Sequence, residues 1–214
     1  MNAVVVAGGE LELSERVRNA VQTAELLIAA DSGAKHLREL RRNADLLIGD
    51  FDSFDPALAG AAEVAPFPRA KDQTDTHLAV REAVRRGATR ITLIASLRGP
   101  RLDHGAANLL LLSADEFAGI DLRAIDGPDE LRAVRHEASI AGQGGDLVTL
   151  LAVTRRAAGV STDGLAYQLH EATLRRGDSR GVSNVLEREH GAVRLRHGVL
   201  LVIHRAGGDP NAIR

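Results

Sequence analysis

Hydrophobic residues in the first 126 positions gather in short runs, and longer stretches with helical spacing separate these runs. The runs predict buried strands at 3–7, 26–30, 46–48, near 65, 91–95 and 122–125. The stretches between them predict helices after Ser14, at 33–42, at 74–86 and at 103–117. Strands that alternate with helices are typical of a parallel sheet covered on both faces, so we expect a three-layer α/β domain.

The pattern changes after Asp126-Gly127-Pro128, where the long helical stretches stop. Short alternating runs follow at 131–140, 147–153, 167–174, 192–195 and 199–204, and glycine-rich breaks such as 142–145 separate them. This alternation predicts an antiparallel domain, which we expect to be a β-sandwich. The sequence therefore predicts two domains, 1–128 and 129–214.

Composition narrows the class of protein. The chain has 214 residues, of which 44% are hydrophobic, and its net charge is −2, so we expect neither nucleic acid nor a membrane surface as a partner. It has no cysteine, which excludes disulfides and thiolate metal sites. No stretch reaches the roughly 20 apolar residues that span a bilayer, and the first residues lack the basic region of a signal peptide. We therefore expect a cytoplasmic protein.

Polar residues follow the predicted strands at the points where helices begin. If the sheet is parallel, all of these loops lie at one edge of it, where α/β proteins bind ligands. The loops are Asp31-Ser32-Gly33, Gly49-Asp50-Phe51-Asp52, Lys71-Asp72-Gln73-Thr74-Asp75 and Arg101-Leu102-Asp103-His104.

The stretch IGDFDSFDP at 48–56 holds two carboxylates, Asp50 and Asp52, that lie two residues apart. In extended backbone their side chains point the same way and repel each other, and a divalent cation relieves that repulsion. A cluster of oxygen ligands suits Mg²⁺. The alternative is that these residues are helix caps and turn residues, and Asp55 before Pro56 fits a cap better than a metal site.

Lys71 and Arg101 bring positive charge into otherwise acidic loops, as phosphate recognition at a helix N-terminus requires. The alternatives are that Thr74 and Asp75 only start a helix and that Arg101 only pairs with Asp103. His104 alone is weak support, because most histidines take no part in chemistry. The chain has no Walker A loop and no G-x-G-x-x-G motif, so a phosphate site here belongs to another class.

In order, these loops resemble the motifs of the thiamine pyrophosphokinase family. The matching segments are ADSGA (30–34), IGDFDS (48–53), KDQTD (71–75), RLDH (101–104), GLAYQL (164–169) and VSN (182–184). The resemblance implies an enzyme that transfers the diphosphoryl group of ATP to thiamine and releases AMP. It also implies an ATP- and Mg-binding α/β domain, a β-sandwich that binds thiamine, and a homodimer with thiamine near the interface.

The resemblance also assigns roles to single residues. It implies that Asp50, Asp52 and Asp75 hold Mg²⁺ and that these three residues and Arg101 are catalytic. Ser183 and Asn184 match the residues that meet thiamine. The nucleotide-binding positions that it implies are Asp31, Ser32, Gly33, Lys71, Gln73, Thr74, Asp103 and His104.

The chain departs from the family pattern in ways that leave the acceptor open. Pro100 stands where the family has a glycine, Ser32 replaces another glycine, Val185 replaces an acidic residue, and there is no tryptophan to stack on thiamine. Three alternatives therefore stand: a pyrophosphokinase for another hydroxymethyl heterocycle such as a pterin, a Mg-dependent phosphohydrolase, and a non-catalytic nucleotide-binding protein.

Overall fold

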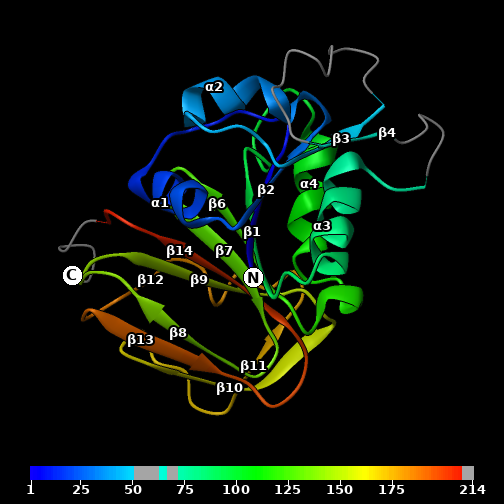
Figure 1. Ribbon diagram of the computed structural model, residues 1–214. Helices are drawn as coiled ribbons and strands as arrows, with labels where there is room; N and C mark the ends of the chain where they lie inside the picture. The colour runs from blue at the N-terminus through cyan, green and yellow to red at the C-terminus, as the bar shows by residue number, and fades with distance from the viewer. Residues whose placement is uncertain (51–62, 67–71, 209–214) are drawn as a thin grey trace. The chain divides into compact units, whose positions relative to one another are not determined.

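The chain forms two structural units, Met1–Gly127 and Pro128–Arg214. They are seen in a computed structural model that describes residues 1–50, 63–66 and 72–208 (Figure 1). None of the helices in these ranges has the length and apolar character needed to cross a membrane. The predicted sites at Asp52, Asp55 and Lys71 lie outside the described residues.

The first unit is built on a parallel sheet, as predicted. Its six strands lie in the order β6-β5-β1-β2-β3-β4, and every neighbouring pair is parallel. Strand β1, in the interior of this sheet, is buried on both faces, and its Val4, Val5 and Val6 are fully buried. The strands are β1 (Asn2–Val6), β2 (Leu26–Ala30), β3 (Leu46–Gly49), β4 (Glu63–Pro66), β5 (Arg90–Ile94) and β6 (Asp121–Asp126).

Helices cover both faces of this sheet. Helices α1 and α2 lie on one side, while α3 and α4 lie on the other (Figure 1). The helix after Ser14 is confirmed, because the Ser14 hydroxyl accepts a hydrogen bond from Val17 N at 3.2 Å and so caps α1. The helical segments are α1 (Glu15–Thr23), η1 (Asp31–His36), α2 (Leu37–Leu40), α3 (Asp75–Arg85), α4 (Leu102–Leu111) and η3 (Asp115–Phe117).

Two predicted helices differ from the structure. The segment 33–42 is a 3₁₀ turn, η1, followed by a single turn of α2, and it ends where Arg41 adopts φ 53°. The segment 103–117 is divided, because α4 ends at Leu111 and only the short η3 follows. Ser113 donates its hydroxyl proton to Leu110 O at 2.8 Å, which is the kind of local bond that competes with helix continuation.

The strands of the second unit form two groups that belong to different sheets, and within each group neighbouring strands are antiparallel, which confirms the predicted strand type. Their orders are β12-β9-β14-β7 and β11-β10-β13-β8. Side chains from both sheets share one core, which includes Leu150, Leu174, Val193 and Leu200. The strands are β7 (Asp129–Val134), β8 (Glu137–Ala141), β9 (Leu147–Ala152), β10 (Arg156–Asp163), β11 (Ala172–Arg175), β12 (Asn184–Val185), β13 (His190–Arg194) and β14 (Leu200–Arg205).

Strand β10 was not predicted. Its sequence, RAAGVSTD, is rich in small residues, and Gly159 at φ 68° interrupts its register with β11 between Ala158 and Val160. The predicted run 131–140 is two strands, and only the end of 167–174 is a strand.

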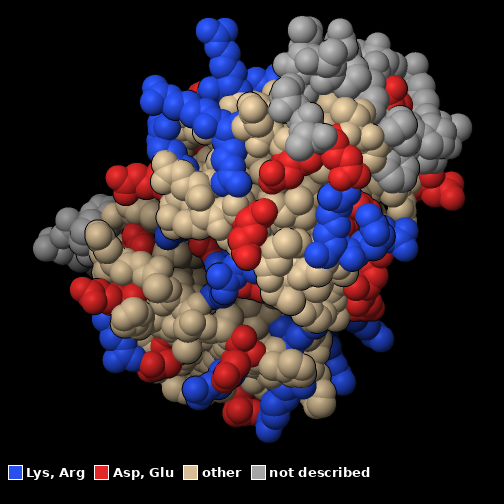
Figure 2. All heavy atoms as spheres, viewed as in Figure 1, with Lys and Arg blue, Asp and Glu red and all other residues tan. Residues whose placement is uncertain are grey.

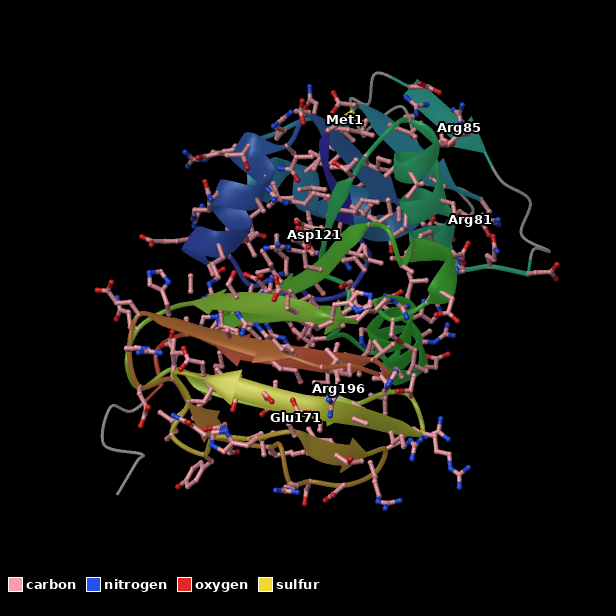
Figure 3. The ribbon with its side chains drawn as sticks, turned by 90° about the horizontal axis from the view of Figure 1, so that it is seen from below. Met1, Arg81, Arg85, Asp121, Glu171 and Arg196 are labelled. Atoms are coloured by element: carbon pink, nitrogen blue, oxygen red, sulfur yellow. The ribbon has the colours of Figure 1, made fainter. Side chains whose placement is uncertain are left out.

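On the outer surface of this unit Glu171 and Arg196 form an ion pair (Figure 3).

A buried carboxylate, Asp146, ties three parts of the second unit together. Its Oδ2 accepts hydrogen bonds from Gln143 N at 3.0 Å and from His204 Nε2 at 2.8 Å, and its Oδ1 accepts one from Gly207 N at 3.0 Å. Burial by itself raises the pKa of the Asp146 carboxyl, but these hydrogen bonds outweigh burial and hold the pKa below its ordinary value. The ionised carboxylate therefore stabilises the folded unit.

We predict that Asp146→Asn destabilises the protein. The amide supplies only one acceptor oxygen, so at least one backbone N–H loses its partner, at a cost of about 1–3 kcal/mol. Thermal unfolding at pH 7 measures the loss as a lower Tm. The matched control is Asp178→Asn, which changes an exposed carboxylate that accepts from Arg180 N at 3.1 Å, and its Tm is expected to stay near wild type.

The Asp146 effect also has an expected pH dependence. A carboxyl whose folded-state pKa is lowered adds stability above the unfolded pKa of about 3.9, and this stability is lost as the pH falls through the folded pKa. The Tm difference between wild type and Asp146→Asn should therefore shrink in the most acidic buffers. A difference that is constant from pH 7 to pH 2 contradicts this assignment.

Candidate functional site

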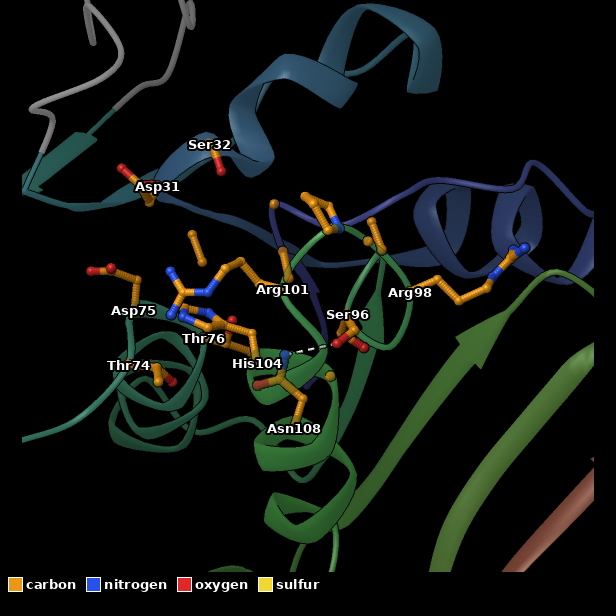
Figure 4. A pocket seen from close by; sticks show the side chains of 18 of the residues that line it. Asp31, Ser32, Thr74, Asp75, Thr76, Ser96, Arg98, Arg101, His104 and Asn108 are labelled. Carbon is orange, nitrogen blue, oxygen red and sulfur yellow. Dashed lines mark hydrogen bonds between the residues drawn. The ribbon is translucent and has the colours of Figure 1, made fainter.

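A cavity of about 400 Å³ lies at the carboxyl ends of the strands in the first unit (Figure 4). Four segments line it: the loop after β1, the start of η1 after β2, the N-terminus of α3, and the loop that leads from β5 into α4. The predicted site residues among its lining are Asp31, Ser32, Thr74, Asp75, Arg101 and His104. The topology thus brings together residues that are far apart in the sequence.

One wall of the cavity consists of two backbones in direct contact. Gly9 N donates to Ala95 O at 2.8 Å, and Glu10 N donates to Arg98 O at 2.9 Å. A Cβ on Gly9 would lie 2.3 Å from Arg98 O and 2.5 Å from Ala95 O, which is closer than real Cβ contacts. Only glycine fits at position 9, so the loops after β1 and β5 are held together at this point.

Two side chains of η1 fix the glycine turn from the other side. Lys35 Nζ donates to Gly8 O at 2.6 Å, and His36 Nε2 donates to Gly9 O at 2.9 Å. Burial lowers the pKa of His36, and the nearby Lys35 charge lowers it further, whereas the bond to Gly9 acts in the opposite direction. The net lowering favours a neutral imidazole that donates through Nε2.

The acidic side of the site comes from the ends of β2 and β3 and the start of α3. Asp31 adopts φ 47°, a left-handed conformation that is costly for a residue other than glycine. Its Oδ1 would lie 3.1 Å from a Cβ on Gly49, so Asp31 packs against the residue that precedes Asp50. Asp75 is the first residue of α3, and Asp31 and Asp75 both line the cavity (Figure 4).

These carboxylates offer oxygen ligands of the kind that Mg²⁺ prefers, so the residues present fit a magnesium ion. Within residues 1–50, 63–66 and 72–208, no three acidic or histidine side chains already form a metal-binding group. Asp50 does not line the cavity, and Asp52 falls outside those ranges. The metal assignments for Asp50, Asp52 and Asp75 therefore stay predictions.

Two arginines of the β5–α4 loop have different surroundings. Arg98 points away from the cavity (Figure 4) and binds Asp126 Oδ2 at 2.8 Å and Glu12 Oε2 at 2.6 Å. The hydrogen bond to Asp126 contributes most, and that to Glu12 contributes next, to raising the pKa of Arg98 above its usual range. Both bonds also fix the loop. Arg101 instead extends toward Asp75 (Figure 4). Its solvent-exposed guanidinium is free to exchange one partner for another.

In the structure the partner of Arg101 is Asp103. The two form a bidentate pair at 2.7 and 2.9 Å, as one alternative for these residues anticipated, and the Arg101 hydrogen bond lowers the pKa of Asp103 to about 2. Both side chains are exposed, so the pair adds little stability and separates readily.

Buried polar groups at the base of the cavity were not predicted. Asn108 Nδ2 donates to Ser96 O at 2.8 Å, and both residues are 4% exposed. Within the described part of the chain the Ser96 hydroxyl has no hydrogen-bond partner. A buried hydroxyl of this kind calls for a ligand or water as its partner. The one sequence signal for Asn108 is its place one helical turn after His104.

Three predicted nucleotide residues play local roles near the cavity. The Thr74 hydroxyl caps α3 by accepting from His77 N at 3.2 Å. Gln73 Oε1 accepts from Arg81 Nη1 at 3.1 Å, and Gln73 is not among the lining residues. Gly33 is buried behind the lining, where a Cβ would lie 2.1 Å from Val6 O. Its role is close backbone packing of η1 against β1.

The predicted thiamine residues lie in the second unit. Asn184 is 6% exposed, its Oδ1 accepts from Tyr167 N and Val185 N at 2.9 Å each, and its Nδ2 donates to Tyr167 O at 2.7 Å. Ser183 adopts φ 58° and its N–H donates to Thr149 Oγ1 at 3.1 Å. The Asn184 amide therefore positions the GLAYQL segment, and direct contact with a ligand requires these bonds to change.

Two family models match the chain, one in each unit. The model "Thiamin pyrophosphokinase, catalytic domain" matches residues 17–122, and the model "Thiamin pyrophosphokinase, vitamin B1 binding domain" matches residues 135–200. Together they cover every segment that lines the cavity except the glycine turn after β1. Comparison with curated proteins gave no match.

Solved structures share the fold. The thiamine pyrophosphokinase of Bacillus subtilis aligns with a TM-score of 0.83 at 24% identity and covers 96% of this chain and 99% of its own. The enzyme from Geobacillus thermodenitrificans aligns with a TM-score of 0.81 at 23% identity over 100% of both chains. The thiamin pyrophosphokinase of Candida albicans aligns with a TM-score of 0.78 at 13% identity, covering 95% and 88%.

We predict that Gly9→Ala damages the cavity wall. The added methyl group meets two carbonyl oxygens, and relief of such overpacking typically costs about 1–3 kcal/mol. Thermal unfolding should show a lower Tm. The matched control is Gly119→Ala, where a Cβ meets no atom within 4 Å and the Tm is expected to hold. Equal Tm values for both variants contradict the proposed contact.

Proposed function

This chain belongs to the thiamin pyrophosphokinase family, and we propose that it transfers the diphosphoryl group of ATP to thiamine, giving thiamine diphosphate and AMP. One observation carries the proposal. Carboxylates (Asp31, Asp75) and cations (Lys35, Arg101) from three separate segments line a single cavity at the carboxyl edge of a parallel sheet. This is the combination that a magnesium–polyphosphate substrate requires.

The cavity suits the nucleotide. Its glycine-rich walls at Gly8, Gly9 and Gly99 let backbone come close to a ligand, and α3 directs its N-terminus toward it. Backbone N–H groups at a helix N-terminus favour phosphate oxygens. We propose that the triphosphate lies between these N–H groups and Arg101, and that Ser96 and Asn108 lie at the base of the nucleotide site.

We propose that Asp50, Asp52 and Asp75 hold Mg²⁺. When bound, the ion supplies charge neutralisation for the polyphosphate and helps to orient it. The protein's own share of the chemistry is positioning and electrostatics. Arg101 gives up its exposed pairing with Asp103 and, with Lys71, offsets negative charge as the reaction proceeds.

The proposed reaction is an in-line displacement at the β-phosphorus of ATP. The thiamine hydroxyl oxygen forms the new bond to this atom, while the bond from the β-phosphorus to the oxygen shared with the α-phosphate breaks. AMP leaves with that oxygen, and a carboxylate of the site accepts the hydroxyl proton. We propose that the acceptor site lies in the second unit and includes Ser183 and Asn184. We also propose that the protein is a cytoplasmic homodimer, as the family resemblance implies.

A single assay tests the function. Incubation with ATP and Mg²⁺ should yield AMP only when thiamine is added. Phosphate release without any acceptor would instead favour a phosphohydrolase, and AMP formation only with a hydroxymethylpterin would favour a different pyrophosphokinase. Binding of ATP without turnover for either acceptor would identify a non-catalytic nucleotide-binding protein.

We predict that Asp75→Asn lowers kcat by about 10²–10³, the usual cost of losing one electrostatic group at a reacting phosphoryl or acyl centre. The matched control is Asp72→Asn, three residues earlier, at an exposed position outside the cavity lining. Steady-state rates at saturating ATP and Mg²⁺ provide the comparison, with Tm as the check on folding. If Asp75→Asn retains activity within a few-fold of wild type, the role assigned to Asp75 is wrong.

A further inference from the structure

A second hollow, of about 510 Å³ and open to solvent, adjoins the cavity on the side of α1 and α2. It is lined by Leu13, Arg18, Lys35, Arg38, Glu39 and Arg41, and we call it the basic groove. Four of its six lining residues are cationic, and only Glu39 is acidic. Figure 2 shows basic side chains gathered over α2. The groove is thus a concentrated patch of positive charge in a chain whose net charge is −2.

The cations of the basic groove differ from most arginines of this unit. Arg85, Arg86, Arg90, Arg98 and Arg123 each form an ion pair with a carboxylate. Among the described residues, by contrast, no carboxylate pairs with the four cations of the groove, Arg18, Lys35, Arg38 and Arg41. Their charge is uncompensated, so it acts on anions in the surrounding solvent.

Lys35 connects the basic groove to the cavity. It lines both hollows, and its ammonium group donates to Gly8 O in the cavity wall at 2.6 Å. A lysine ammonium has three donor protons, and this bond uses one of them. Because Lys35 lines both hollows, the basic groove and the cavity are separated by no more than the length of a lysine side chain. This separation is shorter than the Debye length of roughly 10 Å at 0.1 M salt, so charges of the groove act on a ligand in the cavity.

Arg41 provides a second, independent observation. It closes α2 with φ 53° and ψ 38°, a left-handed C-cap position that glycine normally occupies at no steric cost. Arg41 occupies this position instead, with a strained backbone and with its side chain exposed at the groove. Strained residues of this kind concentrate at functional sites.

We propose that the basic groove is an anion subsite that attracts the triphosphate of ATP and increases the affinity of the adjoining cavity for it. The proposal rests on the proposed function, since it takes ATP as the ligand of the cavity. The recognised chemistry is polyphosphate charge, not the base or the sugar. The groove therefore acts on ATP binding and not on the chemical step.

The test is ATP binding by the Arg38→Gln/Arg41→Gln double variant, measured calorimetrically in Mg²⁺ at low and at high salt. We expect the Kd for ATP to rise about three- to tenfold at low salt, because long-range attraction of this kind is screened by ions, and the difference from wild type to disappear at high salt. The Kd for adenosine, which lacks phosphate, should not change.

The matched control is Arg155→Gln/Arg176→Gln, which removes the same charge from two exposed, neighbouring arginines of the second unit, and it should leave ATP binding at wild-type strength. A second variant, Arg41→Gly, removes the charge and the strain together. It should raise the Tm while weakening ATP binding, a combination that a purely structural role does not produce.

Failure of the proposed function and failure of the anion-subsite proposal give different binding results. If wild-type protein binds no ATP at any salt concentration, the proposed function itself is wrong. If wild type binds ATP and the groove variants bind it equally well at low salt, the groove plays no part and only this inference is overturned. An equal loss of adenosine binding also overturns it, since the effect would then not depend on phosphate charge.

Discussion

The candidate site depends on the direct backbone contact between the loops that follow β1 and β5. Gly9 is the position where these loops touch, and its lack of a side chain allows Ala95 and Arg98 to supply carbonyl acceptors at its surface. Once this contact is made, Lys35 and His36 fix the turn from η1. A rigid wall results, against which carboxylates and cations from other loops can be set at short range.

The cationic side chains around the cavity are of two kinds: some fix the structure through ion pairs, and others can bind an anionic ligand. Arg98 is held by Glu12 and Asp126 and serves to fix a loop, whereas within the described residues the partner of Arg101 is the exposed Asp103. Lys35 is held by a carbonyl, and in the part of the chain that the structure describes no carboxylate pairs with its ammonium group. A polyphosphate site needs cations of this second kind. The exposed pair of Arg101 with Asp103 adds little stability and is given up at small cost, whereas Arg98 would have to leave two carboxylates to bind phosphate.

Much of the fold was predictable, because central strands buried on both faces leave continuous apolar runs, as at 3–7 and 26–30. The meeting of the strand-end loops followed from parallel topology. Strand β10 was missed, since Gly159 and its small neighbours weaken the alternation. Contacts such as His36 to Gly9 and Asn108 to Ser96 were also missed, because they join residues whose proximity only the folded chain defines.

Transfer of two phosphoryl groups as one unit distinguishes the proposed reaction from hydrolysis and from transfer of a single phosphoryl group. Phosphorus NMR of a reaction with ATP, Mg²⁺ and thiamine follows each phosphorus atom separately. For diphosphoryl transfer, the β- and γ-phosphorus signals should leave ATP together and keep their mutual coupling in one new product, which should appear at the rate at which AMP forms. Inorganic phosphate, or a product that carries a single phosphoryl group with ADP beside it, would overturn the proposed diphosphoryl transfer.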